Sequence, residues 1–139
     1  MKKIFFIALM IMVGMVAESY AQSAEEKPLA SAGKQTIDVY YFHATRRCAT
    51  CNAVEDQSQL ALKNLYAQQL ESGDIQFHSV NFEEADGKAL ADKFKVPGQA
   101  LIVVKGESKT DLTSDGFMYA RSAPAKLENS LKKAIDPLL

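Results

Sequence analysis

Apolar and polar residues follow one another in blocks along residues 36–135, and each block has the period of a strand or a helix. Thr36 to Phe42 is rich in β-branched and aromatic residues, and both of its faces become apolar toward its end, which predicts a central strand. Cys48 to Ser72 contains neither glycine nor proline, which predicts one long helix. The apolar side chains that recur there at helical spacing are Leu62, Leu65, Tyr66 and Leu70.

The next three blocks are shorter. Ile75 to Phe82 predicts a second strand, and Glu83 to Phe94 predicts a helix with acidic residues in its first turn, although Gly87 lowers its helix propensity. Ala100 to Lys105 is apolar at almost every position, which predicts a buried strand that stops at Gly106. The middle of the chain thus alternates strand, helix and strand.

The last blocks predict a returning strand and a final helix. Glu107 to Asp115 is polar and predicts a loop, and Gly116 to Arg121 predicts an antiparallel strand. Ser122 is the expected N-cap of a helix with Pro124 in its first turn. The apolar face of this helix is formed by Leu127, Leu131 and Ile135.

The resulting order, β-α-β-α-β-β-α, places the chain in the α/β class. Alternation of strands and helices predicts parallel pairing with right-handed crossovers, and the last two strands are expected to form a hairpin. We therefore expect a small central mixed β-sheet flanked by helices.

The N-terminal residues have the pattern of an export signal. Lysines precede an apolar run from Ile4 to Ala17, and small residues that a signal peptidase reads follow up to Ala21. We expect a signal peptide over residues 1–21. A retained membrane anchor is the alternative, but the run is shorter than the roughly 20 residues of a spanning helix, and Glu18 follows it directly.

The chain after the signal peptide has an expected domain organisation, location and set of partners. Residues 22–34 are polar and rich in small side chains, which predicts a flexible segment, and residues 35–139 form the single domain. The expected location is the periplasm or another extracytoplasmic space, where disulfides persist, and no membrane span is expected in the mature chain. The net charge of −1 and the absence of a basic block predict no nucleic-acid partner. No pattern in the sequence specifies an oligomeric state.

The candidate chemistry lies in Cys48-Ala49-Thr50-Cys51, which contains both cysteines of the chain. If the helix begins here, Cys48 lies at its positive end and Cys51 one turn further in, so the two sulfurs can meet with little backbone change. The helix dipole and the adjacent Arg46 and Arg47 favour the thiolate of Cys48. This pattern predicts a redox-active dithiol.

The order of elements and this motif resemble the thioredoxin superfamily from about Thr36 to Ile135. Residues 40–51, Tyr-Tyr-Phe-His-Ala-Thr-Arg-Arg-Cys-Ala-Thr-Cys, are similar to a group of small exported bacterial proteins, some of which carry labels tying them to a nitro-compound reductase. The resemblance implies a thioredoxin-like fold, no cofactor, and a protein disulfide or dithiol as the partner. It also implies that Cys48 is the attacking thiol and Cys51 the resolving thiol.

The chain departs from the thioredoxin pattern at three places. Ala49-Thr50 is neither the Gly-Pro of a reductase nor the Pro-His of a strong oxidant. Phe42 stands where thioredoxins bury an acid beneath the dithiol, and Asp38 is a poor substitute on the same face of the strand. The cis-proline of the family falls on Ala100, so either Pro97 serves through a rearranged loop or the cis-proline is lost.

Arg46 and Arg47 predict the redox character of the site. Cations beside Cys48 stabilise its thiolate and hence the reduced form, which makes the disulfide more oxidising than that of a typical cytosolic thioredoxin. The alternative is that the two arginines form a solvated turn whose charges contribute little.

Three functions are compatible with these residues. The first is an exported thiol–disulfide oxidoreductase that acts through Cys48 and Cys51. The second is a non-enzymatic binding module, either an accessory subunit of a redox complex or a soft-metal site made by His43 with both cysteines. That set lacks the fourth ligand of a structural zinc site, so no metal is our expectation. The third is a domain with an inert disulfide, which is unattractive because so short a loop constrains little.

Overall fold

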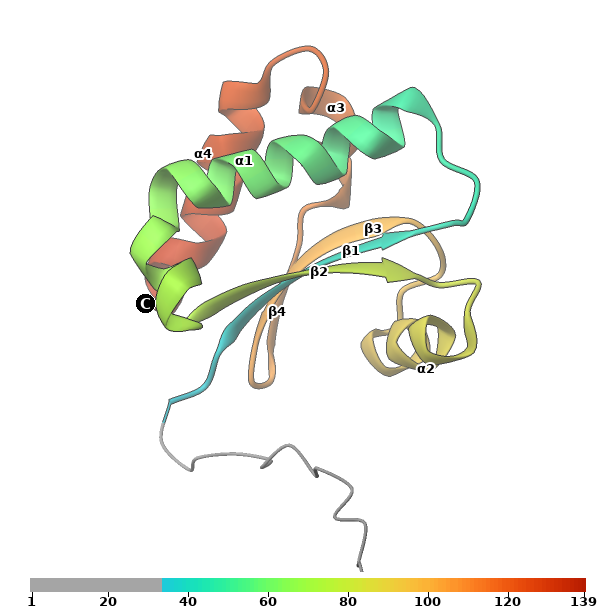
Figure 1. The fold of residues 1–139 in the computed structure, drawn as a ribbon, viewed down its shortest axis with the longest axis horizontal. Helices are drawn as coiled ribbons and strands as arrows, with labels where there is room; N and C mark the ends of the chain where they lie inside the picture. Colours follow the sequence, from blue (N-terminus) through green and yellow to red (C-terminus); the bar gives the residue numbers. More distant parts are fainter. Residues whose placement is uncertain (1–33) are drawn as a thin grey trace, which may run out of the picture. The chain divides into compact units, whose positions relative to one another are not determined.

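The computed structural model describes residues 34–139, so the expected signal peptide and nearly all of the expected flexible segment lie outside the described residues. The elements follow in chain order (Figure 1): β1 (Ile37–His43), α1 (Ala49–Ser72), β2 (Ile75–Asn81), α2 (Ala85–Phe94), β3 (Ala100–Lys105), β4 (Ser108–Asp111), α3 (Thr113–Tyr119), α4 (Pro124–Ile135) and a short 3-10 helix, η1 (Asp136–Leu138). None of the helices in residues 34–139 is long and apolar enough to cross a membrane.

The strands of the described residues form a four-stranded mixed sheet with the order β2-β1-β3-β4. β1 pairs with β2 in parallel, as predicted, and β3 and β4 form an antiparallel hairpin. The expected parallel pairing of β3 is wrong, because β3 runs antiparallel to β1, with Ala100 opposite Phe42 and Val104 opposite Asp38.

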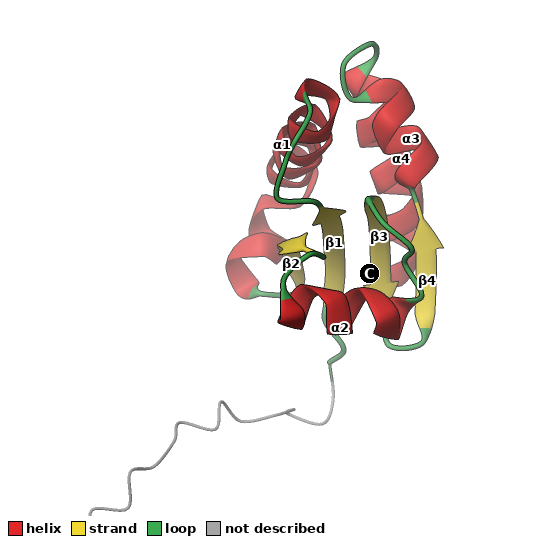
Figure 2. Ribbon diagram, turned by 90° about the vertical axis from the view of Figure 1, so that its right-hand side faces the viewer, coloured by secondary structure: helices red, strands yellow, loops and turns green. Residues whose placement is uncertain are grey.

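The connection through α2 explains this direction. A parallel crossover must carry the chain back along the full length of the strand, a distance of about 23 Å for a seven-residue strand. The ten residues of α2 span only about 15 Å, and the helix lies across the strands rather than along them (Figure 2). The chain therefore enters β3 at the end of the sheet where β1 stops.

Helices cover both faces of the sheet. α1, α3 and α4 lie on one face and α2 on the other (Figures 1 and 2). Alternation along β1 divides its side chains between two cores: Ile37, Val39 and Tyr41 pack in the core under α1 and α4, whereas Phe42 packs in the smaller core under α2. The apolar face predicted for the last helix is confirmed, since Leu127, Leu131 and Ile135 are all buried.

The segment after β3 differs from the prediction. The loop expected over residues 107–115 contains β4, and the strand expected over residues 116–121 is wrong, because the chain forms α3 there. Gly116 determines how closely this helix packs: a Cβ at this position would lie 3.2 Å from Val54 Cγ1 and 3.4 Å from Leu101 Cδ2. The missing side chain allows α3 to approach both α1 and β3 closely.

The N-cap of α4 also differs from the prediction. The cap is Ala123, with Pro124 in the first turn as expected. Ser122 instead belongs to the end of α3, where its Oγ donates a hydrogen bond to the Met118 carbonyl over 2.7 Å. A serine hydroxyl can satisfy either end of a helix, and here a carbonyl of the preceding helix lies within its reach.

Candidate redox site at the start of helix α1

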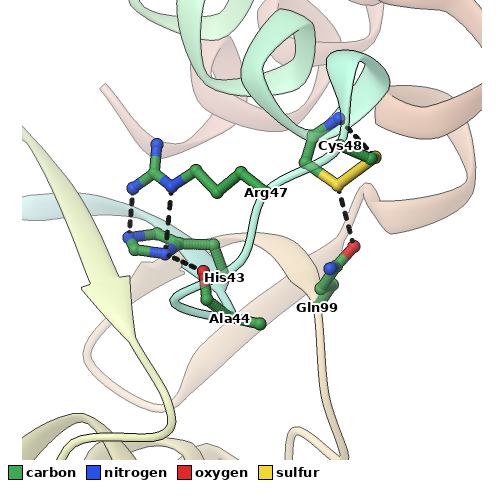
Figure 3. Close-up of a disulfide and its surroundings, with 6 residues drawn as sticks. His43, Ala44, Arg47, Cys48 and Gln99 are labelled. Carbon is green, nitrogen blue, oxygen red and sulfur yellow. Dashed lines mark hydrogen bonds between the residues drawn. A yellow bond between two sulfur atoms is a disulfide. The ribbon is translucent and has the colours of Figure 1, made fainter.

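Cys48 and Cys51 form a disulfide at the N-terminus of α1, with their Cα atoms 5.0 Å apart. Cys48 is the N-cap residue, with the extended backbone that a cap requires (φ −87°, ψ 165°). The backbone N–H of Cys51 donates to Cys48 Sγ over 3.1 Å (Figure 3). The sulfur therefore occupies the place of the oxygen in an ordinary serine or aspartate cap.

The two sulfurs differ in access to solvent. Cys48 is exposed, whereas Cys51 is only 1% exposed because it lies inside the first turn of α1. A partner can therefore approach Cys48 and not Cys51. The site carries one accessible and one buried sulfur.

The turn between β1 and α1 is anchored to the end of β2 and the residues that follow it. The Thr45 backbone N–H donates to Glu83 Oε2 over 2.9 Å, and Thr45 Oγ1 accepts from Asn81 Nδ2 over 2.9 Å. The hydrogen bonds from Thr45 hold the pKa of Glu83 below its ordinary value. The His43 carbonyl accepts a further hydrogen bond from the Phe82 N–H. These hydrogen bonds hold the backbone of the turn that leads to Cys48.

Arg47 reaches away from the disulfide. Its guanidinium forms an ion pair with Glu55 of α1 and donates to Ser79 Oγ over 3.2 Å. Figure 3 shows the side chain extending toward His43 rather than toward Cys48. The Arg47 charge is therefore offset by Glu55, which leaves Arg46 as the cation of this turn that is exposed and has no hydrogen-bond or ion-pair partner within residues 34–139. Influence of either arginine on the Cys48 thiolate stays a prediction.

His43 is buried beneath this turn, and both of its ring nitrogens are occupied. Nδ1 lies 3.0 Å from the Ala44 carbonyl oxygen and 3.2 Å from Arg47 Nε, and Nε2 lies against the Arg47 guanidinium (Figure 3). Within the part of the chain that the structure describes, no three His, Cys, Asp or Glu side chains are grouped to hold a metal ion.

Neither residue considered for the buried acid lies in a position to exchange protons with the dithiol. Phe42 is fully buried in the core under α2. Asp38 lies near the start of β1, at the other end of the strand from Cys48, and its carboxylate accepts from His78 Nε2 over 2.8 Å. The hydroxyl of Tyr41 lies near Arg47 and Glu55, and its pKa is raised to about 12 chiefly by burial.

The loop before β3 supplies a residue that the sequence did not reveal. Pro97 is exposed and Ala100 is buried in the core under α2, and every peptide bond of the described residues is trans. Gln99 faces the site instead: its Oε1 lies 3.5 Å from Cys51 Sγ (Figure 3). Successive side chains of an extended segment alternate, so the position beside Ala100 points to the α1 side. The roles expected of Pro97 and Ala100 stay predictions.

Comparison with protein-family models gives no match to this sequence, and comparison with curated proteins gives none. Among solved structures, the chain is similar to thioredoxin O2 from Arabidopsis thaliana in its oxidized state, with a TM-score of 0.50 and 20% identity over 70% of this chain and 74% of that chain. It is also similar to a chain called a malarial protein, with a TM-score of 0.46 and 20% identity over 72% of this chain and 98% of that chain. The likeness to thioredoxin O2 and the mixed four-stranded sheet between helices show that this chain has a thioredoxin-like fold.

Proposed function

We propose that this chain is a thiol–disulfide oxidoreductase that exchanges disulfides with protein partners through Cys48 and Cys51. The observation that carries the proposal is the unequal pair at the start of α1, in which the capping residue Cys48 is exposed and Cys51 is buried. An exposed sulfur can be attacked by, or can attack, a partner. A buried sulfur one turn away can react only with its neighbour.

The exchange follows from this arrangement. In the reduced protein, the Cys48 thiolate attacks one sulfur of a partner disulfide, and the other partner sulfur leaves as a thiolate and takes up a proton. Cys51 then attacks Cys48 Sγ, the internal disulfide forms, and the second partner sulfur leaves with the proton of Cys51. Two electrons have passed to the partner, and the reverse sequence oxidises a partner dithiol.

The location and the redox character of the site are part of the same proposal. The pattern of residues 1–21 supports export to the periplasm or another extracytoplasmic space. The cap on Cys48 and the exposed Arg46 support a stabilised thiolate and hence an oxidising disulfide. A titration against glutathione that gave a potential as low as about −270 mV would count against this character.

Trapping tests the exchange itself. Cys51→Ser leaves the attacking thiol and removes the resolving one, so it should accumulate mixed disulfides with partner proteins that reductant releases. Cys48→Ser is the matched control, because the remaining Cys51 is buried and should trap almost nothing. If the two variants trap equally little, and the wild-type protein fails to exchange with glutathione, the oxidoreductase proposal is wrong.

A further inference from the structure

The buried sulfur of the pair has a polar neighbour on the opposite element. Cys51 Sγ lies against Gln99 Oε1 at 3.5 Å, and Gln99 comes from the loop that leads into β3. Cys51 is 1% exposed, so water cannot replace this contact. In the disulfide the sulfur bears no proton, and the two atoms meet only at van der Waals distance.

Reduction changes the nature of this contact. The Cys51 sulfur gains a proton, and a thiol within reach of an amide oxygen donates a hydrogen bond to it. The neighbouring sulfur does not compete for the same partner, because Cys48 Sγ accepts the backbone N–H of Cys51. The surroundings thus favour a thiolate on Cys48 and a protonated thiol on Cys51.

We propose that Gln99 accepts a hydrogen bond from the reduced Cys51 thiol and so sets the redox potential and the rate of the resolving step; this inference rests on the proposed function. Gln99 gains the hydrogen bond only in the reduced state, so it stabilises the dithiol relative to the disulfide. A disulfide whose reduced form is stabilised is a stronger oxidant.

The same hydrogen bond slows resolution. Cys51 must lose its proton to attack Cys48 in a mixed disulfide, and the proton passes to the departing partner sulfur. A neutral amide oxygen holds the proton on Cys51 without removing it. Mixed disulfides of this chain therefore persist longer than they would beside a carboxylate, which can accept the proton.

Gln99→Met tests the equilibrium effect, because methionine keeps the length of the side chain and removes the amide oxygen. We expect the equilibrium constant for reduction by glutathione to fall about fivefold, as for the loss of one net hydrogen bond. That change corresponds to about 20 mV at 29.6 mV per tenfold. Gln68→Met, on the exposed face of α1, is the matched control and should leave the constant unchanged.

Gln99→Glu tests the kinetic effect in the full-length protein. The carboxylate can take the proton of Cys51, so release of a preformed mixed disulfide with glutathione should become about tenfold faster or more. If the role of Gln99 were purely structural, the two substitutions would alter thermal unfolding but would leave the equilibrium constant with glutathione and the release rate of the mixed disulfide unchanged.

The outcomes separate the inference from the proposed function. If the wild-type protein exchanges with glutathione while Gln99→Met keeps its equilibrium constant, or Gln99→Glu keeps its release rate, the inference about Gln99 is overturned and the oxidoreductase remains. If the wild-type protein does not exchange at all, the proposed function fails first.

Discussion

The backbone N–H of Cys51 donates a hydrogen bond to the sulfur of Cys48 over 3.1 Å, so the first cysteine caps the helix that contains the second. Capping is normally done by an oxygen of Ser, Thr, Asp or Asn, and a negatively charged acceptor is favoured at the positive end of the helix dipole. A thiolate is a better acceptor than a thiol. Ionisation of Cys48 and the start of α1 are therefore coupled.

The cap predicts the reactivity of Cys48 in the reduced protein. We expect alkylation of Cys48 by iodoacetamide to reach half of its maximal rate at a pH below about 8.5, where a free cysteine ionises. Mass mapping should place the first adduct on Cys48, since Cys51 is buried. The reduced chain unfolded in urea is the control. An identical pH profile in the folded and unfolded proteins would show that the cap does not act on the thiolate.

Arg46 and Arg47 carry the same charge, but we expect the replacement of Arg47 to reduce the stability of the protein more than the replacement of Arg46. Arg47→Ala leaves the carboxylate of Glu55, which is 13% exposed, without its ion-pair partner, and should lower the free energy of unfolding by about 1–3 kcal/mol. Arg46→Ala should change it by less than about 0.5 kcal/mol, since this residue is exposed and has no partner within residues 34–139.

Urea unfolding of the oxidised protein measures the difference between the two arginines. Glu55→Gln supplies the second half of a double-mutant cycle, and the combined variant should lose less than the sum of the two single losses. Equal losses for Arg46→Ala and Arg47→Ala would contradict the ion pair as the anchor of the turn.

The placement of the cysteine pair could be predicted from the sequence, whereas its polar neighbour could not. The position of Cys48 and Cys51 at the start of a helix follows from a short local pattern. Gln99 is 48 residues from Cys51 in the chain, and the resemblance to thioredoxins drew attention to Ala100 instead. Neighbouring residues of an extended segment face opposite sides of the sheet, so Ala100 packs under α2 while Gln99 faces the disulfide.

The topology shows the same limit. Residues 116–121 carry apolar and aromatic side chains that fit either a strand or a helix, and the segment forms part of α3, where Gly116 packs against Val54 of α1 and Leu101 of β3. The direction of β3 likewise depends on where α2 lies across the sheet, which no local pattern encodes. The helix α4 is predicted well because burial of one face decides it. α1 is predicted as one long helix, but its backbone leaves helical geometry at Tyr66 (φ −135°, ψ 36°), where the helix kinks.

Gly87 is required by packing in spite of its poor helix propensity. A Cβ at this position would lie 1.9 Å from the Asn81 carbonyl oxygen, so α2 can approach the end of β2 only without a side chain. We expect Gly87→Ala to lower the free energy of unfolding by about 1–3 kcal/mol, as overpacked positions do. Gly98→Ala is the matched control, because nothing lies within 4 Å of its added Cβ. A stabilised Gly87→Ala protein would disprove the close approach.

The hydroxyl of Tyr41 is fully buried and has no hydrogen-bond partner among residues 34–139, so it should cost stability rather than supply it. Tyr41→Phe keeps the shape of the ring, and we expect a free energy of unfolding that is unchanged or higher by about 1 kcal/mol at neutral pH. Tyr66→Phe is the matched control of opposite sign, because the Tyr66 hydroxyl donates to Asp136 Oδ1 over 2.5 Å and its loss should destabilise the protein by about 1 kcal/mol.

Comparing the pH dependence of stability in the wild-type protein and in Tyr41→Phe isolates the ionisation of Tyr41 from that of the other tyrosines. Burial raises the pKa of Tyr41 from 10.0 to about 12, so the neutral phenol is favoured in the folded state. Below pH 10 the phenol is neutral in both the folded and the unfolded chain, whereas between pH 10 and 12 it ionises in the unfolded chain first, so the folded state loses stability as the pH rises through this range. The wild-type protein should therefore lose more stability than Tyr41→Phe over this range in urea titrations. Parallel losses in the two proteins would mean that Tyr41 ionises as easily in the folded chain as in the unfolded one.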